Sequence, residues 1–224
     1  MNDNTINKKN FIGQVTDTVK ANLKSIIIFI SISFVIFLSF QIYSFYNSNK
    51  IQKNSITFFK AQNLEDINII KDTITNLSNE NNFYGILSKL ELIEINLNQQ
   101  NNQNAITLYF ELMNNKNLDS IYKSAIASRA SYQFIDLNFE DLSIDYSQII
   151  GDFISYIDDD LITYQGIKLE LSYLAKILEA EKNSIEYQNF NEAIDMYNNI
   201  MNSDAASSAT KDRINKIHEF FSYK

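Results

Sequence analysis

Residues 187–201 read YQNFNEAIDMYNNIM, and the pattern of this stretch occurs twice earlier in the chain. Its small or apolar residue, the tyrosine four positions later and the apolar pair at its end would share one face of a helix. The same order is found in residues 105–113 and 142–150. We therefore predict one structural unit used repeatedly, in which the small residue lets two helices approach and the tyrosine packs against the next unit. The predicted packing positions are Ala105, Tyr109, Leu142, Tyr146, Ala193 and Tyr197.

The spacing of these copies and the residues in front of them indicate helical hairpins. Residues 139–141 (FED) and 190–192 (FNE) precede two of the copies and place an acidic residue in the first helical turn, where the helix dipole favours it. Equivalent positions are 37 and 51 residues apart, and tetratricopeptide units repeat at roughly 34 residues. The longer step requires a lengthened helix over 161–182 or an insertion near Asp158.

The composition favours helices throughout. The chain has no proline and four glycines, so the residues that punctuate sheets and tight turns are nearly missing, and Asn-rich breaks separate amphipathic stretches. We expect an all-α fold, in which an N-terminal transmembrane helix is followed by an α-solenoid of tetratricopeptide-like helical hairpins. The expected helices of the repeat part are 83–97, 104–114, 119–136, 142–150, 161–182, 190–201 and 204–223.

Residues 25–46 read SIIIFISISFVIFLSFQIYSFY and contain no charge. Their number matches the roughly 20 apolar residues needed to cross a bilayer as a helix. Tyr43 and Tyr46 lie where interfacial aromatic side chains sit in spanning helices. A cleavable signal peptide is one alternative, but residues 44–46 offer no small-residue cleavage site. A buried core helix is another, although this stretch lacks a charged face.

Charge is distributed unevenly along the chain, whose net charge is −8. Residues 1–60 carry seven lysines and two acidic residues, whereas residues 61–224 carry twelve basic and twenty-five acidic residues. The acidic part should be repelled by nucleic acid and by anionic lipid, so a nucleic-acid partner is not expected. Four lysines precede residues 25–46 and three follow, which favours a cytoplasmic N-terminus. The expected parts are a basic cytoplasmic tail (1–24), a transmembrane helix (25–46), a juxtamembrane linker or helix (47–60) and a periplasmic repeat domain (61–224).

The layout of nearly the whole chain resembles a known family of membrane proteins. A short basic tail, one span and a degenerate repeat domain are similar to the ancillary subunits of the bacterial Sec translocon. The clearest repeat segments are residues 87–113 (LSKLELIEINLNQQNNQNAITLYFELM) and residues 187–201. The resemblance implies a protein of the bacterial inner membrane that sits beside the translocon and helps pass exported proteins to periplasmic chaperones. The chain departs from the repeat pattern in lacking tryptophan, proline and most hairpin glycines.

A membrane-anchored adaptor that binds other proteins is the expected function, with a translocon, chaperone or envelope complex as partner and no small-molecule substrate. Stacked repeats expose a concave surface that receives a partner helix or an extended segment. One alternative is a structural envelope-complex component that self-associates through its helices without a role in protein export. A soluble domain released by cleavage is another. The candidate residues of the partner groove are Lys89, Tyr122, Arg129 and Lys168.

Catalysis is not expected from the residues that the chain offers. There is no cysteine, and the one histidine, His218, lies near the C-terminus, where a helix-end or partly exposed histidine is commoner than a metal ligand. The aspartates at 158–160 lack the spacing of a calcium loop and fit a solvated helix N-terminus better. Phosphate-binding and hydrolase motifs are missing. We expect no enzyme, no cofactor and no metal.

Overall fold

The chain is helical wherever its structure is described. A computed structural model describes the backbone of residues 3–223 and the side chains of Asn22, Lys24 and residues 28–223, and this part contains nine α-helices, a short 3-10 helix and no strand. The helices are α1 (Asp3–Ala61), α2 (Ile67–Ser78), α3 (Phe83–Asn98), α4 (Asn102–Met113), α5 (Ser120–Glu140), α6 (Ser147–Ser155), α7 (Ile162–Lys182), η1 (Tyr187–Asn189), α8 (Asn191–Asn202) and α9 (Ser208–Ser222).

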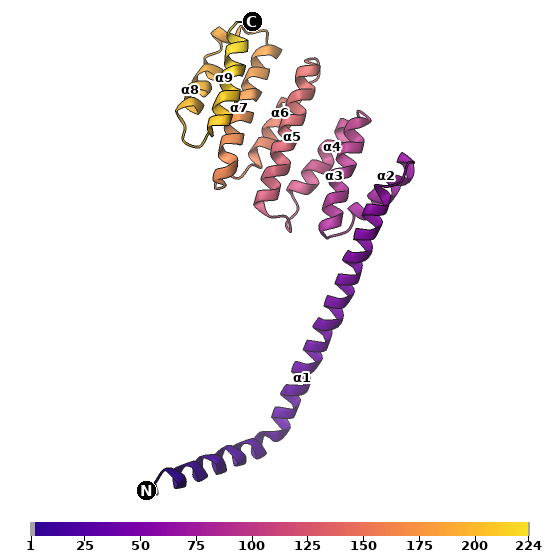
Figure 1. The fold of residues 1–224 in the computed structure, drawn as a ribbon, viewed down its shortest axis with the longest axis vertical. Coiled ribbons are helices and arrows are strands. Elements are labelled where there is room, and N and C mark those ends of the chain that lie inside the picture. Colours follow the sequence, from indigo (N-terminus) through magenta and orange to yellow (C-terminus); the bar gives the residue numbers. More distant parts are fainter. Residues whose placement is uncertain (1–2, 224) are drawn as a thin grey trace.

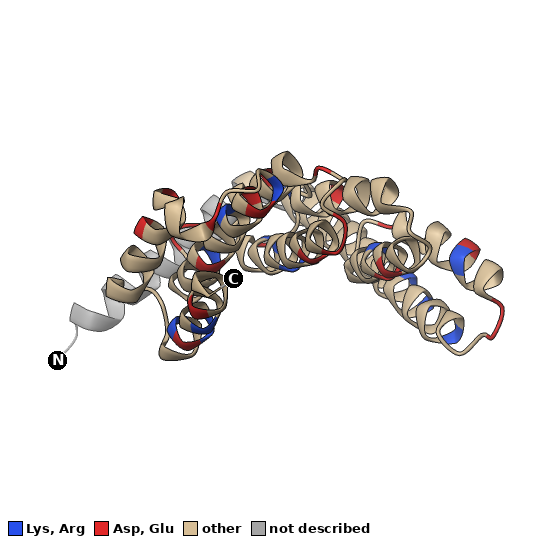
Figure 2. Cartoon of the chain, turned by 90° about the horizontal axis from the view of Figure 1, so that it is seen from above, with Lys and Arg blue, Asp and Glu red and all other residues tan. Residues whose placement is uncertain are grey.

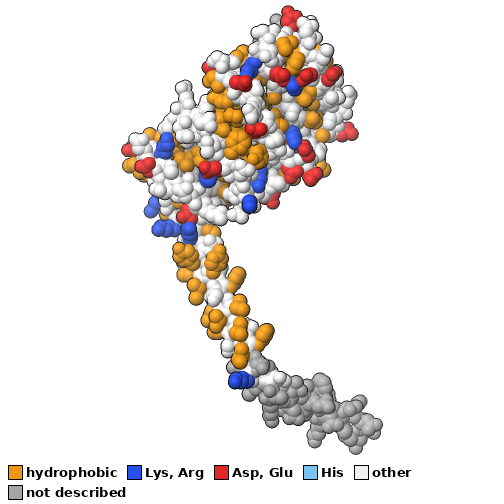
Figure 3. Space-filling model, turned by 180° about the vertical axis from the view of Figure 1, so that it is seen from behind, with side chains coloured by type: hydrophobic (Ala, Val, Ile, Leu, Met, Phe, Trp, Pro, Cys, Tyr) orange, Lys and Arg blue, Asp and Glu red, His pale blue; other side chains and the backbone are white. Residues whose placement is uncertain are grey.

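Helix α1 projects from the other helices as a rod (Figure 1). Its segment Ile28–Ala61 contains a stretch long and apolar enough to cross a membrane, and the side chains of that stretch are not buried by the rest of the chain. Figure 3 shows this apolar length with lysine or arginine side chains at both of its ends. The alternative of a buried core helix is therefore wrong, because nothing in the fold covers these side chains.

The last turns of α1 belong to the folded part of the chain. Phe58 and Ala61 are buried in a cluster with Ile74, Leu77 and Leu92, which α2 and α3 supply. A helix that is unbroken from the apolar stretch into this cluster leaves no flexible connection between them. Residues 47–60, expected as a linker or a helix, are thus helical and serve as the first packed element.

The helices after α1 alternate in direction and form two rows. Neighbours along the chain pack as pairs, most extensively α2 with α3 and α3 with α4. In one row α1 contacts α3, α5 contacts α7 and α7 contacts α9, whereas no comparable contact joins two even-numbered helices in the described part. The odd-numbered row is therefore the more crowded one, and Figure 2 shows the folded part bent into an arc.

Polar side chains mark where several helices begin. Asp66, Asn82 and Asp119 accept hydrogen bonds from the first free backbone N–H groups of α2, α3 and α5. Ser207 does the same for α9. These bonds satisfy donors that have no partner within the helix, which stabilises the start of each helix. Helix α2 lies in a stretch for which the sequence pattern predicted no separate helix.

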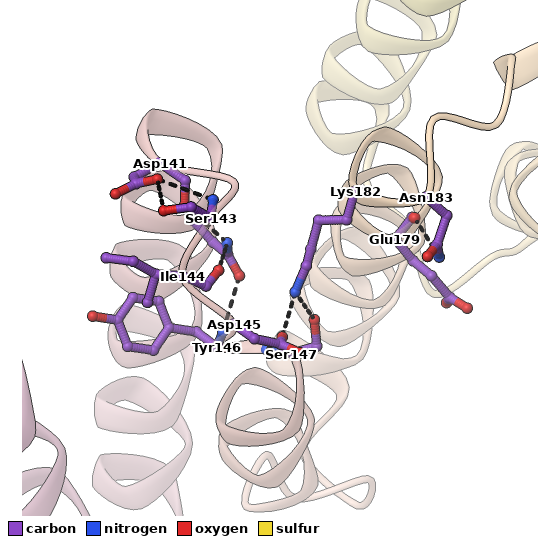
Figure 4. Close-up of polar contacts among 10 residues, drawn as sticks. Asp141, Ser143, Ile144, Asp145, Tyr146, Ser147, Glu179, Lys182 and Asn183 are labelled. Atoms are coloured by element: carbon purple, nitrogen blue, oxygen red, sulfur yellow. Dashed lines mark hydrogen bonds and ion pairs between the residues drawn. The ribbon is translucent and has the colours of Figure 1, made fainter.

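The expected helix at 142–150 is wrong in its first half. Helix α5 continues to Glu140, residues 141–146 form a loop, and α6 begins only at Ser147. The buried side chain of Asn138 holds the loop: its Nδ2 donates to the carbonyl of Ile144 at 2.5 Å, and its Oδ1 accepts from the backbone N–H of Tyr146 at 3.1 Å. Figure 4 shows Ile144 and Tyr146 in this loop. The FED motif at 139–141 accordingly ends a helix, whereas the FNE motif at 190–192 opens α8 as predicted.

Candidate functional site

A groove lies between α3 and α5. The two helices belong to the same row, yet they do not pack extensively against each other as α5 and α7 do. The space between them has a volume of about 610 Å³ and is open to solvent on one side. Its walls are mostly apolar and come from Phe83, Ile86, Leu87, Leu90, Leu118, Tyr122, Ala125 and Ile126.

The floor and the mouth of the groove differ in burial. Ile126 is buried in the main core, and Ile86, Leu90 and Leu118 pack against that core, so the floor is fixed by the fold. At the mouth Phe83 is 62 % exposed and Tyr122 is 61 % exposed. Large apolar side chains that face water above a fixed apolar floor are typical of a surface that binds another molecule.

Polar groups close the two ends of the groove. At one end Asn117 on the α4–α5 loop donates from Nδ2 to Oδ1 of Asn81 on the α2–α3 loop at 3.1 Å. Towards the other end Arg129 forms an ion pair with Glu94 at 2.7 Å. Both pairs are exposed, so each contributes little to stability.

The structure brings together two of the four predicted groove residues. Tyr122 and Arg129 both line the groove between α3 and α5. Lys89 instead forms an ion pair with Glu111 of α4. Lys168 lies on α7, away from the groove, where Nζ contacts Asp159 at 2.7 Å and the carbonyl of Ile157 at 3.0 Å. Lys168 thus holds the α6–α7 loop, a role that its position in a helix did not reveal.

The predicted packing residues fall into three groups. Ala105, Tyr109 and Ala193 are buried, and the ring of Tyr109 meets those of Phe134 and Phe153 edge-on. Burial raises the pKa of the Tyr109 hydroxyl to about 12.

The other two tyrosines are half-buried, while the leucine is not packed. The hydroxyl of Tyr146 accepts a hydrogen bond from Asn102 at 2.9 Å, and its ring contacts Phe134. Tyr197 stacks on His218 with ring centroids 3.8 Å apart. Leu142 is 41 % exposed on the α5–α6 loop, because that copy of the pattern is not a helix.

His218 belongs to an aromatic network that ties η1, α7, α8 and α9 together. Its Nδ1 lies 2.6 Å from the hydroxyl of Tyr187, which in turn lies 2.8 Å from the hydroxyl of Tyr173. Burial lowers the pKa of His218, so the neutral ring is favoured. The histidine therefore fits a packing role, in the last turns of a helix as the sequence analysis expected.

Phe83 and the ion pair of the buried Glu170 with the half-exposed Arg213 were missed by the sequence analysis. Phe83 follows two asparagines, and the cap formed by Asn82 fixes it as the first residue of α3. The pattern of a helix start was present there, but nothing local in the sequence shows that α5 stands apart from α3. Glu170 and Arg213 lie 43 residues apart, so only the fold joins them.

Three comparisons with known proteins give no relative for this chain. No protein family, no curated protein and no solved structure matches it.

Proposed function

We propose that this chain is a membrane-anchored adaptor that binds other proteins through the groove between α3 and α5. The observation that carries the proposal is the fixed apolar floor of that groove beneath two exposed aromatic side chains, Phe83 and Tyr122. No group of three histidine or acidic side chains is placed to hold a metal in the part that the structure describes. The features that are present favour recognition of a chain over chemistry on a substrate.

The proposal includes the finer description of the fold and of the location. Helices α1 to α9 are taken as an α-solenoid of tetratricopeptide-like hairpins, in which the odd-numbered helices line the concave side. This is supported by the contacts within the odd-numbered row and by the bend of the two rows. The apolar length of α1 is taken to span a bacterial inner membrane once, with the folded part in the periplasm. The length and the uncovered side chains of this stretch support a single span, and the excess of lysines before it supports the orientation.

By resemblance the chain acts as an ancillary subunit of the Sec translocon and helps pass exported proteins to periplasmic chaperones. An acidic, helical domain held close to the membrane suits a transient contact with emerging chains. The expected location is tested by single cysteines at Asn7 and at the exposed Asn98, in a chain that has no other cysteine. A membrane-impermeant maleimide added to intact cells should label Asn98→Cys and not Asn7→Cys. Labelling of the Asn7 variant alone would rule out the periplasmic role.

The binding function is tested by photo-crosslinking in living cells. A photoreactive phenylalanine at Tyr122 should crosslink to translocon subunits or to exported chains, because this side chain stands at the mouth of the groove. The matched control carries the same amino acid at Asn199, an exposed position on α8 outside the groove. Equal products from both positions would contradict a specific groove. Products formed only with other copies of the chain would support the self-associating envelope component instead.

A further inference from the structure

We infer that the groove receives the juxtamembrane segment of another membrane protein, at the point where that segment leaves the bilayer. This inference rests on the proposed function and names the class of partner and the place of contact. It follows from where the groove lies relative to the apolar length of α1, from the stiffness of the connection and from the charge around the mouth.

The position of the groove is fixed by α1. Lys50 forms an ion pair at 2.6 Å with Glu80, which precedes the groove residues Asn81 and Asn82. Lys50 is one turn beyond Tyr46, so the α2–α3 loop stands about 6 Å further along the helix than the end of the apolar stretch. In Figure 1 the lower ends of α3 and α5 face the projecting length of α1. The end of the groove closed by Asn81 and Asn117 is therefore its membrane-side end.

The connection is too stiff for the groove to turn away from the membrane. Helix α1 runs unbroken through residues 47–60, and Phe58 and Ala61 anchor its end in the cluster with α2 and α3. A segment that emerges from the bilayer beside α1 would meet the groove without a search through solution, which raises its effective concentration.

The charge of the membrane-side loops indicates which kind of partner segment fits the groove. The loops on the membrane side of the folded part carry Glu80, Asp119, the aspartates at 158–160 and Asp204, against the single lysine Lys116. Lys50 and Lys168 pair with Glu80 and Asp159, so the other carboxylates make this edge acidic, and of these Asp119 lines the groove. This acidic edge is repelled by anionic lipid headgroups, so the mouth of the groove should stay free of the lipid surface. It attracts lysine and arginine. The expected occupant is thus a helix or extended segment with one apolar face and basic residues next to its own span.

The test combines crosslinking with a change in the distance between the groove and the membrane. A photoreactive phenylalanine replaces Phe83 in the full-length chain, in its native membrane, and the crosslinked peptide of the partner is identified by mass spectrometry. In a second variant seven residues that favour a helix are inserted after Asn47. They lengthen α1 by two turns, about 10 Å, and nearly preserve the helical phase. The control carries the same insertion after Asn10, before the apolar stretch, where it does not raise the folded part.

The expected peptide lies within the first twenty or so residues beyond a membrane span of the partner. The insertion after Asn47 should reduce the product at least five-fold or move it by about seven residues away from that span, and the control insertion should leave it unchanged. A product that maps to a soluble protein, or that the insertion does not alter, would overturn this inference and leave the adaptor function standing. A product with a second copy of this chain would also overturn it. No product from Phe83 or from Tyr122 would contradict both proposals.

Discussion

Arg213 on α9 holds Glu170 on α7 through two hydrogen bonds, from Nε to Oε1 at 2.9 Å and from Nη2 to Oε2 at 2.5 Å. Glu170 is only 4 % exposed, whereas the arginine side chain is half-exposed. A buried carboxylate is tolerated when a cation and good hydrogen bonds compensate for its lost hydration. The pair therefore locks the last helix onto the long α7 in one orientation.

Removal of the arginine should destabilise the C-terminal helices. We expect Arg213→Ala to lower the free energy of unfolding by about 1–3 kcal/mol, less than for a fully buried pair because water reaches the guanidinium side. Thermal unfolding of the full chain in detergent, followed by circular dichroism, measures the change. The double variant Glu170→Gln with Arg213→Ala should recover part of the loss, because it leaves no uncompensated charge. A double variant that is less stable than Arg213→Ala would contradict this account.

Gly85 in the first turn of α3 should not tolerate a side chain. A Cβ placed there would lie 1.8 Å from the carbonyl oxygen of Glu80 and 2.8 Å from its carbon, and backbone atoms cannot move aside easily. We expect Gly85→Ala to destabilise the chain by about 1–3 kcal/mol and to shift the α2–α3 loop. Gly151 in α6 is the matched control, because a Cβ there meets nothing within 4 Å.

We expect the control substitution to change the stability in the opposite direction. Gly151→Ala should stabilise α6 by about 0.5–1 kcal/mol, since alanine is the better helix former. Denaturant unfolding of both variants at one protein concentration provides the comparison. If the two substitutions shift the midpoint equally, then close approach at Gly85 does not determine the packing of α2 on α3.

His218 should make the stability depend on pH. Because burial lowers the pKa of this side chain, the unfolded chain binds a proton more readily than the folded one below the ordinary histidine pKa of about 6.5. Its contribution to stability is therefore fully present above pH 6.5 and declines as the pH falls towards the lowered folded pKa.

The variant His218→Gln isolates the effect of the histidine. Glutamine keeps a polar group towards Tyr187 but does not titrate. The difference in melting temperature between the natural chain and the variant should shrink or reverse between pH 7.5 and pH 5.5. A difference that stays constant over this range would show that protonation of His218 is not coupled to unfolding.

Substitutions at the neighbours Phe58 and Phe59 should destabilise the chain to very different extents. Phe58 is buried against α2 and α3, whereas Phe59 is mostly exposed. We expect Phe58→Ala to destabilise the junction of α1 with the folded part by about 3–5 kcal/mol, because it removes a large buried ring. Phe59→Ala should cost less than about 1 kcal/mol. Hydrogen exchange of α2 reports the difference, and equal exchange in the two variants would show that α1 is not anchored by Phe58.

Periodicity was sufficient to predict most of the helices. The segments around Ala105 and Ala193 are helices whose predicted small residue is buried, because their apolar positions follow one face over three turns. The pattern failed at Leu142, where the same spacing is met by chance across a loop. What ends α5 there is the side chain of Asn138, which bonds to backbone groups six and eight residues away. Hydrogen bonds from a side chain to nearby backbone groups compete with continuation of the helix, and they form only when the following loop folds back towards that side chain.

The sequence alone determined that the chain is helical, that one stretch is long and apolar enough to cross a membrane, and where most helices lie, because these features depend on neighbours along the chain. Only the tertiary structure decided that α1 continues into the folded part, that α3 and α5 stand apart, and that Tyr122 and Arg129 line the groove while Lys89 and Lys168 do not. Each of these results depends on contacts between residues distant in sequence. One face of a helix can pack against several partners, and only the whole arrangement of helices selects among them.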